Sequence, residues 1–175
     1  KIKKDKNIIV INGERGLGNN LILPSGPLRE IASLAIKKSD IIILIGKDKT
    51  KFREKYHHQI KEKNIFEGKI VSLKNGSNKK VLAFSGIGNN ESFFKTLENN
   101  NFKVLKKTSF PDHYQYSEKE IGELIAIAKK NDLIPITTEK DIKRISDSLK
   151  HKIEYLKIEI EINKKDEIVS KILEF

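Results

Sequence analysis

Short apolar runs recur along the chain, and most of them end at glycine, asparagine or threonine. They are KNIIVIN at 6–12, DIIILIG at 40–46, KKVLAFSGIGN at 79–89, FKVLKKTSF at 102–110 and LIPITT at 133–138. Continuous β-branched runs of about four to eight residues bounded by turn residues are typical of strands buried on both faces of a sheet. We therefore predict a strand at each run.

Helical spacing fills the segments between these runs. REIASLAIKKS at 29–39 and NESFFKTLENNN at 90–101 place apolar residues on one face, and Asn90 is the predicted cap of the second helix. The polar segment 47–64 is also expected to be helical. Strands that alternate with helices predict βαβ units and a mostly parallel sheet.

The last third of the chain carries the clearest local signals. SEKEIGELIAIAKKND at 117–132 opens with a capping box between Ser117 and Glu120. YLKIEIEI at 155–162 alternates strictly, which predicts a half-exposed antiparallel or edge strand, and KDEIVSKILEF at 165–175 predicts an amphipathic helix. The sequence contains no repeat and no low-complexity linker, so we predict a single α/β domain over 1–175. We expect a three-layer, sandwich-like body with this strand and helix at its carboxyl end.

Composition and charge narrow the classes of function. The 175 residues carry a formal net charge of +11, but only four of the 35 basic residues are arginines and the lysines are spread along the whole chain. Nucleic-acid recognition relies on clustered charge and on the planar arginine fork, so we predict no nucleic-acid partner. Cysteine is absent, which excludes disulfides and thiolate metal sites. No run reaches the about 20 apolar residues that span a bilayer.

A loop rich in glycine and proline follows the first predicted strand. GERGLGNNLILPSGPLRE at 13–30 has no periodicity, and a long loop at the carboxyl end of a strand lies where open α/β sheets bind ligands. Arg15 and Arg29 are candidate phosphate clamps, and Glu14 is a candidate partner for a sugar hydroxyl or a metal. An elaborate crossover loop with locally paired arginines explains the same residues. The loop lacks the terminal Gly-Lys-Ser/Thr of a Walker A motif.

Two further stretches carry candidate chemistry. In SFPDHYQYS at 109–117, Asp112 and His113 are adjacent, and an imidazole beside a carboxylate suits proton transfer near neutrality, although a solvent-facing turn is the plainer explanation. In TTEKD at 137–141, Thr137, Thr138 and Lys140 stand where a strand becomes a helix. This position predicts a helix cap and permits contacts to an anion or a nucleotide.

The order of four blocks is more specific than any one of them. RGLGNNLILPSGPLRE, then AFSGIG with FF after it, then FPDHYQYS, then TTEKD resembles the carboxyl-terminal part of tetraacyldisaccharide 4'-kinase, the lipid A 4'-kinase. The resemblance covers the chain up to about Ile145. It departs from the family at Asn12, where aspartate is frequent, at Leu17, where phenylalanine is usual, and at the pair Asn89-Asn90.

The resemblance implies a P-loop-kinase-related fold and an ATP- and Mg²⁺-dependent transfer of phosphate to the 4'-hydroxyl of an acylated glucosamine disaccharide 1-phosphate. It implies that His113, next to Asp112, is the best catalytic candidate and works with an aspartate from the other half of the enzyme, which accepts the hydroxyl proton. Glu14, Arg15, Asn19 and Arg29 match the substrate-facing loop. The family acts in the cytoplasm, peripheral to the inner membrane, so a membrane surface is an implied partner.

The family's Walker A loop, its partner aspartate and its membrane-anchoring helix would all precede Lys1. We therefore predict that this chain holds half of an active site, that the amino-terminal half is its partner and binds most of the ATP and Mg²⁺, and that the chain alone has little activity. Two other possibilities stay open from the residues: a non-catalytic module that binds a phosphosugar or nucleotide, and an inactive remnant of the kinase.

Overall fold

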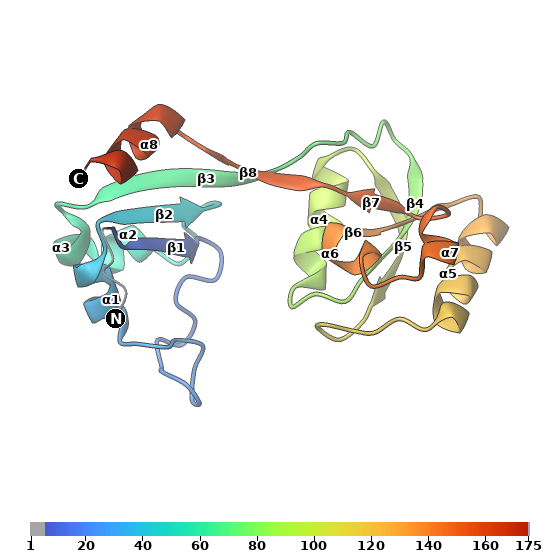
Figure 1. Ribbon diagram of the computed structural model, residues 1–175, viewed down its shortest axis with the longest axis horizontal. Helices are drawn as coiled ribbons and strands as arrows, with labels where there is room; N and C mark the ends of the chain where they lie inside the picture. The colour runs from blue at the N-terminus through green and yellow to red at the C-terminus, as the bar shows by residue number, and fades with distance from the viewer. Residues whose placement is uncertain (1–5, 175) are drawn as a thin grey trace. The chain divides into compact units, whose positions relative to one another are not determined.

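The computed structural model describes residues 6–174, and the chain divides into two compact units (Figure 1). Unit 1 holds the described residues up to Ile70 together with those from Ile160 onward, and unit 2 holds Val71–Glu159. The chain enters unit 2 within β3 (Asn64–Ser72) and leaves it within β8 (Ile158–Ile162). The sequence shows no boundary there because both crossings lie inside strands, where no proline- or glycine-rich linker is needed.

Unit 1 is built on a four-stranded sheet in the order β1-β2-β3-β8. The strands β1 (Ile8–Asn12), β2 (Ile41–Ile45) and β3 are parallel, with Ile43 opposite both Val10 and Phe66. The central strand β2 is buried on both faces, which explains its unbroken aliphatic run. At the edge, β8 is antiparallel, as its alternating sequence predicts, but its aliphatic side chains Ile158 and Ile160 are exposed, so neither face is buried as the half-exposed strand was expected to be.

Helices cover both faces of this sheet. The short helices α1 (Ala32–Lys38), α2 (Phe52–Lys55) and α3 (His57–Ile60) pack on one face, and α8 (Lys165–Leu173) packs on the other through Ile168. The segment 47–64, where a helix was expected, forms two separate helical turns, α2 and α3. They meet at Tyr56, whose φ of −110° is not helical.

Unit 2 is built on a second four-stranded sheet, in the order β5-β4-β6-β7, and every pairing in it is parallel. Its strands are β4 (Lys80–Ser85), β5 (Lys103–Ser109), β6 (Ile134–Thr138) and β7 (Glu154–Leu156). The predicted strand 155–162 is thus divided at Lys157. Its first residues extend the sheet of unit 2, and the rest forms β8. Both parts are edge strands.

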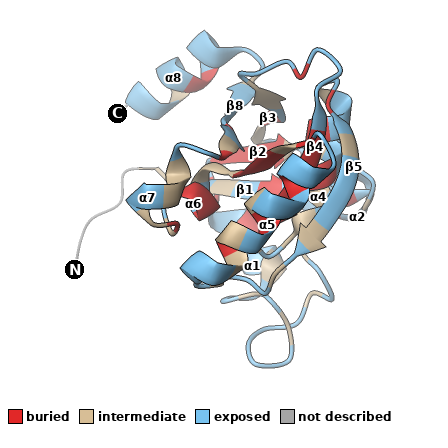
Figure 2. Cartoon of the chain, turned by 90° about the vertical axis from the view of Figure 1, so that its right-hand side faces the viewer, coloured by how far each residue is buried: buried red, intermediate tan, exposed pale blue. Residues whose placement is uncertain are grey.

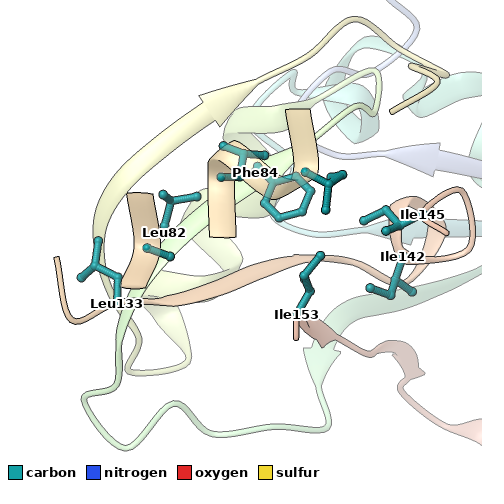
Figure 3. Packing of buried hydrophobic residues seen from close by; sticks show 9 residues of the cluster. Leu82, Phe84, Leu133, Ile142, Ile145 and Ile153 are labelled. Carbon is teal, nitrogen blue, oxygen red and sulfur yellow. The ribbon is translucent and has the colours of Figure 1, made fainter. Parts of the chain in front are cut away.

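The central strand β4 explains why unit 2 has three layers. Val81 and Ala83 pack with α4 (Asn90–Asn99), whereas Leu82 and Phe84 pack with α5 (Glu118–Lys130) on the opposite face. Figure 2 shows β4 as buried, and Figure 3 shows Leu82 and Phe84 among the isoleucines and leucines of that second core. Burying a side chain such as Phe84 stabilises the fold by about 1.5–3 kcal/mol.

The predicted α/β class and mostly parallel sheet are confirmed. Two short helices, α6 (Glu139–Ile142) and α7 (Asp147–Lys150), complete the fold. No helix among residues 6–174 is long and apolar enough to cross a membrane.

Candidate functional site

Three of the stretches singled out in the sequence meet at one edge of the sheet in unit 2. The strands β4, β5 and β6 are parallel neighbours, so their carboxyl ends share an edge. After them come the turn at 86–89, the loop 110–117 and the start of α6. Ligands of open α/β sheets bind at this edge, outside the carboxyl ends of the strands.

Asn90 ties the first two of these segments together. Its Oδ1 accepts hydrogen bonds from the Ser85 hydroxyl at 2.7 Å and from the amide of Ile87 at 3.3 Å, and its Nδ2 donates to the carbonyl of Phe110 at 3.0 Å. The prediction that Asn90 caps α4 is wrong by one residue. Asn89 is the cap, and its Oδ1 accepts from the amide of Ser92. Adjacent asparagines offer the same local signal, and only the position of β5 decides between them.

A buried carboxylate joins the turn after β4 to α6. Asp141 is fully buried, and its Oδ2 accepts from the amide of Gly86 at 3.1 Å and from the hydroxyl of Thr138 at 2.7 Å. Its Oδ1 lies 3.2 Å from NH1 of Arg144 in a salt bridge. Each carboxylate oxygen therefore has a partner, as a buried charge requires.

The arginine connects this carboxylate to the histidine. NH1 of Arg144 also donates to the carbonyl of Gly86 at 3.2 Å, and its NH2 lies 3.3 Å from Nδ1 of His113. A guanidinium has donors only, so Nδ1 must accept this hydrogen bond. A neutral imidazole in this arrangement therefore carries its proton on Nε2.

The backbone of the loop presents the imidazole to solvent. His113 has a φ of +59°, and its amide donates to the carbonyl of Gly86 at 3.1 Å and to Oδ1 of Asp112 at 3.0 Å. The left-handed conformation is uncommon for a residue with a side chain, and histidine tolerates it better than most. The side chain is 81% exposed, and its Nε2 lies 3.9 Å from Oδ1 of Asp112.

Aromatic side chains support the loop from below. The ring of Tyr116 packs edge-on against Phe84 of the core and against Phe110. Its hydroxyl is buried and has no hydrogen-bond partner among the described residues. Burial raises the pKa of Tyr116, and the nearby Asp141 carboxylate raises it further, so this phenol stays neutral.

The base of the loop is fixed by a capping box. The Ser117 hydroxyl accepts a hydrogen bond from the amide of Glu120, and the Glu120 carboxylate accepts from the amide and the hydroxyl of Ser117, as the sequence predicts. The hydrogen bond from the Ser117 side chain, with further ones from Tyr114 and the Ser117 amide, lowers the pKa of Glu120 to about 2. The carboxylate therefore stays ionised and holds the loop across the neutral range.

The residues of TTEKD fall into three environments. The Thr137 hydroxyl is fully buried and donates to the carbonyl of Phe84 at 2.8 Å, and Thr138 caps α6, while Lys140 is exposed. The sequence pattern gave no role in a site to Asp141 or Arg144. Their spacing of three residues is compatible with an ion pair across the turn that ends α6, and it was the one local signal for their contact.

The glycine-rich loop of unit 1 is stiffened by Asn19. Its Oδ1 accepts from the amide of Leu21 at 3.1 Å, and its Nδ2 donates to the carbonyl of Ser25 at 2.9 Å. At Gly26 a Cβ atom would lie 2.3 Å from both Asn19 Oδ1 and the carbonyl oxygen of Leu21, so the turn has no space for a side chain. In this structure Asn19 holds the loop in shape.

The charged residues of this loop remain at the surface. Glu14 forms a salt bridge of 2.6 Å with Lys49. Arg15 and Arg29 are exposed, and neither forms an ion pair with any residue between 6 and 174. Arg15 lines a cavity of about 100 Å³ together with Thr50 and Lys55. Two cations and a hydroxyl around so small a space suit an anion of the size of a phosphate group.

A larger cavity of about 590 Å³ in unit 1 lies against β2, β3 and β8. None of the residues predicted to bind ligands lines it, and four of its charged side chains are already paired, as Arg53–Glu67 and Lys69–Glu161. Across the described part of the chain, no three His, Asp or Glu side chains gather where they could hold a metal ion. The structure thus assembles His113, Asp112 and Thr138 in unit 2, and Glu14, Arg15, Asn19 and Arg29 in unit 1.

Comparison with known proteins gives one consistent answer. The family model for Tetraacyldisaccharide-1-P 4'-kinase matches residues 1–175. The chain is 37% identical to the tetraacyldisaccharide 4'-kinase of Pelagibacter ubique over 98% of this chain and 56% of that protein. It is 33% identical to the enzyme of Rickettsia typhi over 98% of this chain and 53% of that protein. The chain therefore spans about half the length of the curated relatives it matches.

A solved structure has the same fold. The crystal structure of LpxK from Aquifex aeolicus in complex with ATP superposes with a TM-score of 0.64 at 23% identity, over 97% of this chain and 52% of that one. This likeness confirms the predicted α/β fold. From the match of the family model and from these relatives, the chain belongs to the tetraacyldisaccharide 4'-kinase family.

Proposed function

We propose that this chain is the carboxyl-terminal half of a kinase that transfers phosphate from ATP to the 4'-hydroxyl of a tetraacyl glucosamine disaccharide 1-phosphate. Membership of the family supports the reaction. The observation that carries the proposal is the contact between Arg144 and His113, because it fixes which imidazole nitrogen bears the proton at an exposed site on the ligand-binding edge of a sheet.

His113 acts through its Nε2–H in this proposal. With Nδ1 occupied by Arg144, Nε2–H donates to a carboxylate of the amino-terminal half and holds it against the 4'-hydroxyl. As the hydroxyl oxygen attacks the γ-phosphorus and the bond to the leaving ADP breaks, that carboxylate takes the hydroxyl proton. Phosphoryl transfer depends chiefly on such positioning and on charge stabilisation. Asp112, 3.9 Å from Nε2, keeps the imidazole turned toward this side.

The loop of unit 1 binds the phosphorylated disaccharide. Arg15 and Arg29 are free of ion pairs among the described residues and so are available to a phosphate. Glu14 stands next to Arg15 and already binds a cationic side chain, and its carboxylate suits a sugar hydroxyl. Asn19 keeps this loop in the shape that presents them.

The nucleotide and Mg²⁺ are bound mainly by the amino-terminal half. No stretch of the 175 residues matches a Walker A loop, and residues 6–174 contain no cluster of three metal-ligating side chains. Thr138 and Lys140 at the start of α6 are secondary contacts for the nucleotide. The complete enzyme works in the cytoplasm, peripheral to the inner membrane, where its acylated substrate resides.

Reconstitution tests the proposal. The chain is expressed alone and together with the amino-terminal half of the Pelagibacter ubique relative, and transfer of labelled phosphate from ATP to the acylated disaccharide is measured. We expect turnover only from the pair. Robust turnover by the isolated chain would refute the idea of a half site.

Two matched variants then separate catalysis from binding. In the reconstituted enzyme, His113→Ala should lower kcat by about 10²–10⁴-fold, the range that general base catalysis contributes, because the carboxylate that takes the proton is no longer held in place, while substrate binding is largely kept. His151→Ala removes another exposed histidine of unit 2 and should leave turnover unchanged. Equal effects of the two variants, together with retained binding, would favour a non-catalytic binding module.

A further inference from the structure

The loop between β1 and α1 exposes a continuous aliphatic tip. Leu21, Ile22 and Leu23 are consecutive and all three are exposed, with Pro24 next to them. Figure 1 shows this loop, in blue, projecting from the sheet of unit 1. Scattered exposed leucines are ordinary, but three successive aliphatic side chains on a projecting loop leave an apolar surface that needs a partner.

The tip is shaped to enter an apolar phase. The amides of Leu23, Ser25, Gly26 and Leu28 all donate to carbonyls within the loop, at 2.8–3.2 Å. The amide of Leu21 donates to the Asn19 side chain, and proline has no amide hydrogen to satisfy. Among the described residues, the amide of Ile22 forms no such hydrogen bond. The other amide donors from 21 to 28 are paired and so do not oppose transfer out of water, whereas each unpaired one costs several kcal/mol.

Charge beside the tip indicates what it meets. Arg29 directly follows Leu28, which forms an isolated β-bridge with Ile22. No described residue forms an ion pair with Arg29. The neighbouring Glu30 is bound to Lys38 at 3.3 Å, so it does not neutralise the arginine. The chain as a whole carries +11. An aliphatic tip next to an unpaired cation on a basic protein complements an anionic lipid surface, where apolar side chains enter the acyl region and cations stay at the headgroups.

We propose that residues 21–24 insert into the surface of an anionic phospholipid bilayer and that Arg29 contacts its headgroups. The projection of the loop favours a bilayer over a protein partner, because a convex tip enters a fluid surface without a complementary groove. The inference deepens the proposed function, since a kinase of a membrane lipid must reach a bilayer. Its readout is vesicle binding, which does not depend on turnover, so either proposal can fail without the other.

A fluorescence experiment tests insertion directly. The chain contains no tryptophan, so Leu23→Trp introduces a unique probe. Leu105→Trp is the matched control, because Leu105 on β5 is 59% exposed, as is Leu23. With vesicles of mixed phosphatidylglycerol and phosphatidylcholine, we expect the emission of Leu23→Trp to shift to shorter wavelength and to be quenched by brominated acyl chains. Leu105→Trp should show neither effect.

Binding by sedimentation with the same vesicles adds the energetic test. Leu23→Glu should weaken vesicle binding by at least about tenfold, since it removes one inserted aliphatic side chain, whereas Leu105→Glu should not. Arg29→Gln should weaken binding about fivefold, and added salt should remove the difference.

Three results would overturn the proposal. One is a tryptophan response that is equal at positions 23 and 105. Another is a blue shift without vesicles that grows with protein concentration, which would assign the tip to a second copy of the chain. The last is a response to dispersed acylated disaccharide but not to phospholipid vesicles, which would assign it to the acyl chains of the substrate.

Discussion

Replacing the buried Asp141 by asparagine tests the network that positions His113. In one orientation the new amide group points its NH₂ at Arg144, so that two donors face each other. In the other orientation the NH₂ faces the amide of Gly86 and the hydroxyl of Thr138. Neither orientation satisfies all three donors, and the guanidinium loses its counter-charge in both.

The size of the effect follows from burial. Removing one partner of a buried ion pair costs about 3–5 kcal/mol. The Asp141 carboxylate is 0% exposed but the Arg144 side chain keeps 19% exposure, so we expect a loss of about 3 kcal/mol at the low end of that range. Because Asp141 bonds only to residues of unit 2, the loss should be confined to that unit.

Amide hydrogen exchange, analysed peptide by peptide, measures the loss of stability in each unit separately. Exchange in β4 and β6 should accelerate about a hundredfold, which is the factor that about 3 kcal/mol represents, while β1 and β2 of unit 1 serve as the internal reference. Asp147→Asn is the control. Asp147 is also ion-paired, to Lys150 at 2.7 Å, but its side chain is 94% exposed, so no measurable change is expected. If the two variants behave alike, the buried network does not hold the site and the reasoning fails.

Other predictions follow from single features of the fold. Because the folded-state pKa of Glu120 is lowered to about 2 from a usual 4.5, its contribution to stability is complete above about pH 4.5 and is lost as pH falls toward 2. Glu120→Gln should therefore flatten the acid limb of the stability profile, and urea midpoints at pH 3 and pH 6 should differ less than in the unaltered chain; an unchanged slope contradicts this. Phe84→Ala should cost about 3–5 kcal/mol in urea unfolding, because the ring is fully buried in the core of unit 2, and a loss below about 1 kcal/mol would show that the core collapses around the cavity. Gly26→Ala should disrupt the loop, because its Cβ would lie 2.3 Å from Asn19 Oδ1 and from a main-chain oxygen, whereas Gly122→Ala in α5 meets nothing within 4 Å and should stabilise by about 0.5–1 kcal/mol. Thermal unfolding of both variants checks this, and a stabilised Gly26→Ala variant would refute the close approach.

Much of the fold follows from local signals. The aliphatic runs specify β1, β2, β4 and β6, since a continuous β-branched run has few other stable states in a compact domain. The capping box at Ser117 is equally local, because its hydrogen bonds join residues three apart. The order of four motifs was sufficient to indicate the family, which the comparisons confirm.

Tertiary structure alone decided how these parts are combined. Alternation of apolar and polar residues indicates a strand, but it does not indicate which sheet the strand joins. The division of 155–162 between two sheets was therefore not predictable. The same limit explains Asn90, whose partner Phe110 lies beyond the next strand.

Local sequence signals are sufficient for β1, β2, β4 and β6, for the capping box at Ser117, for the glycine-rich loop and for the family. The contact of Arg144 with both Asp141 and His113 depends on the folded chain, because it requires β5 and β6 to flank β4 in one parallel sheet, so that the segments that follow them lie at the same edge. Hydrophobic pattern and turn chemistry act over a few residues, and a site assembled from residues 86, 113 and 144 depends on interactions that no local pattern records.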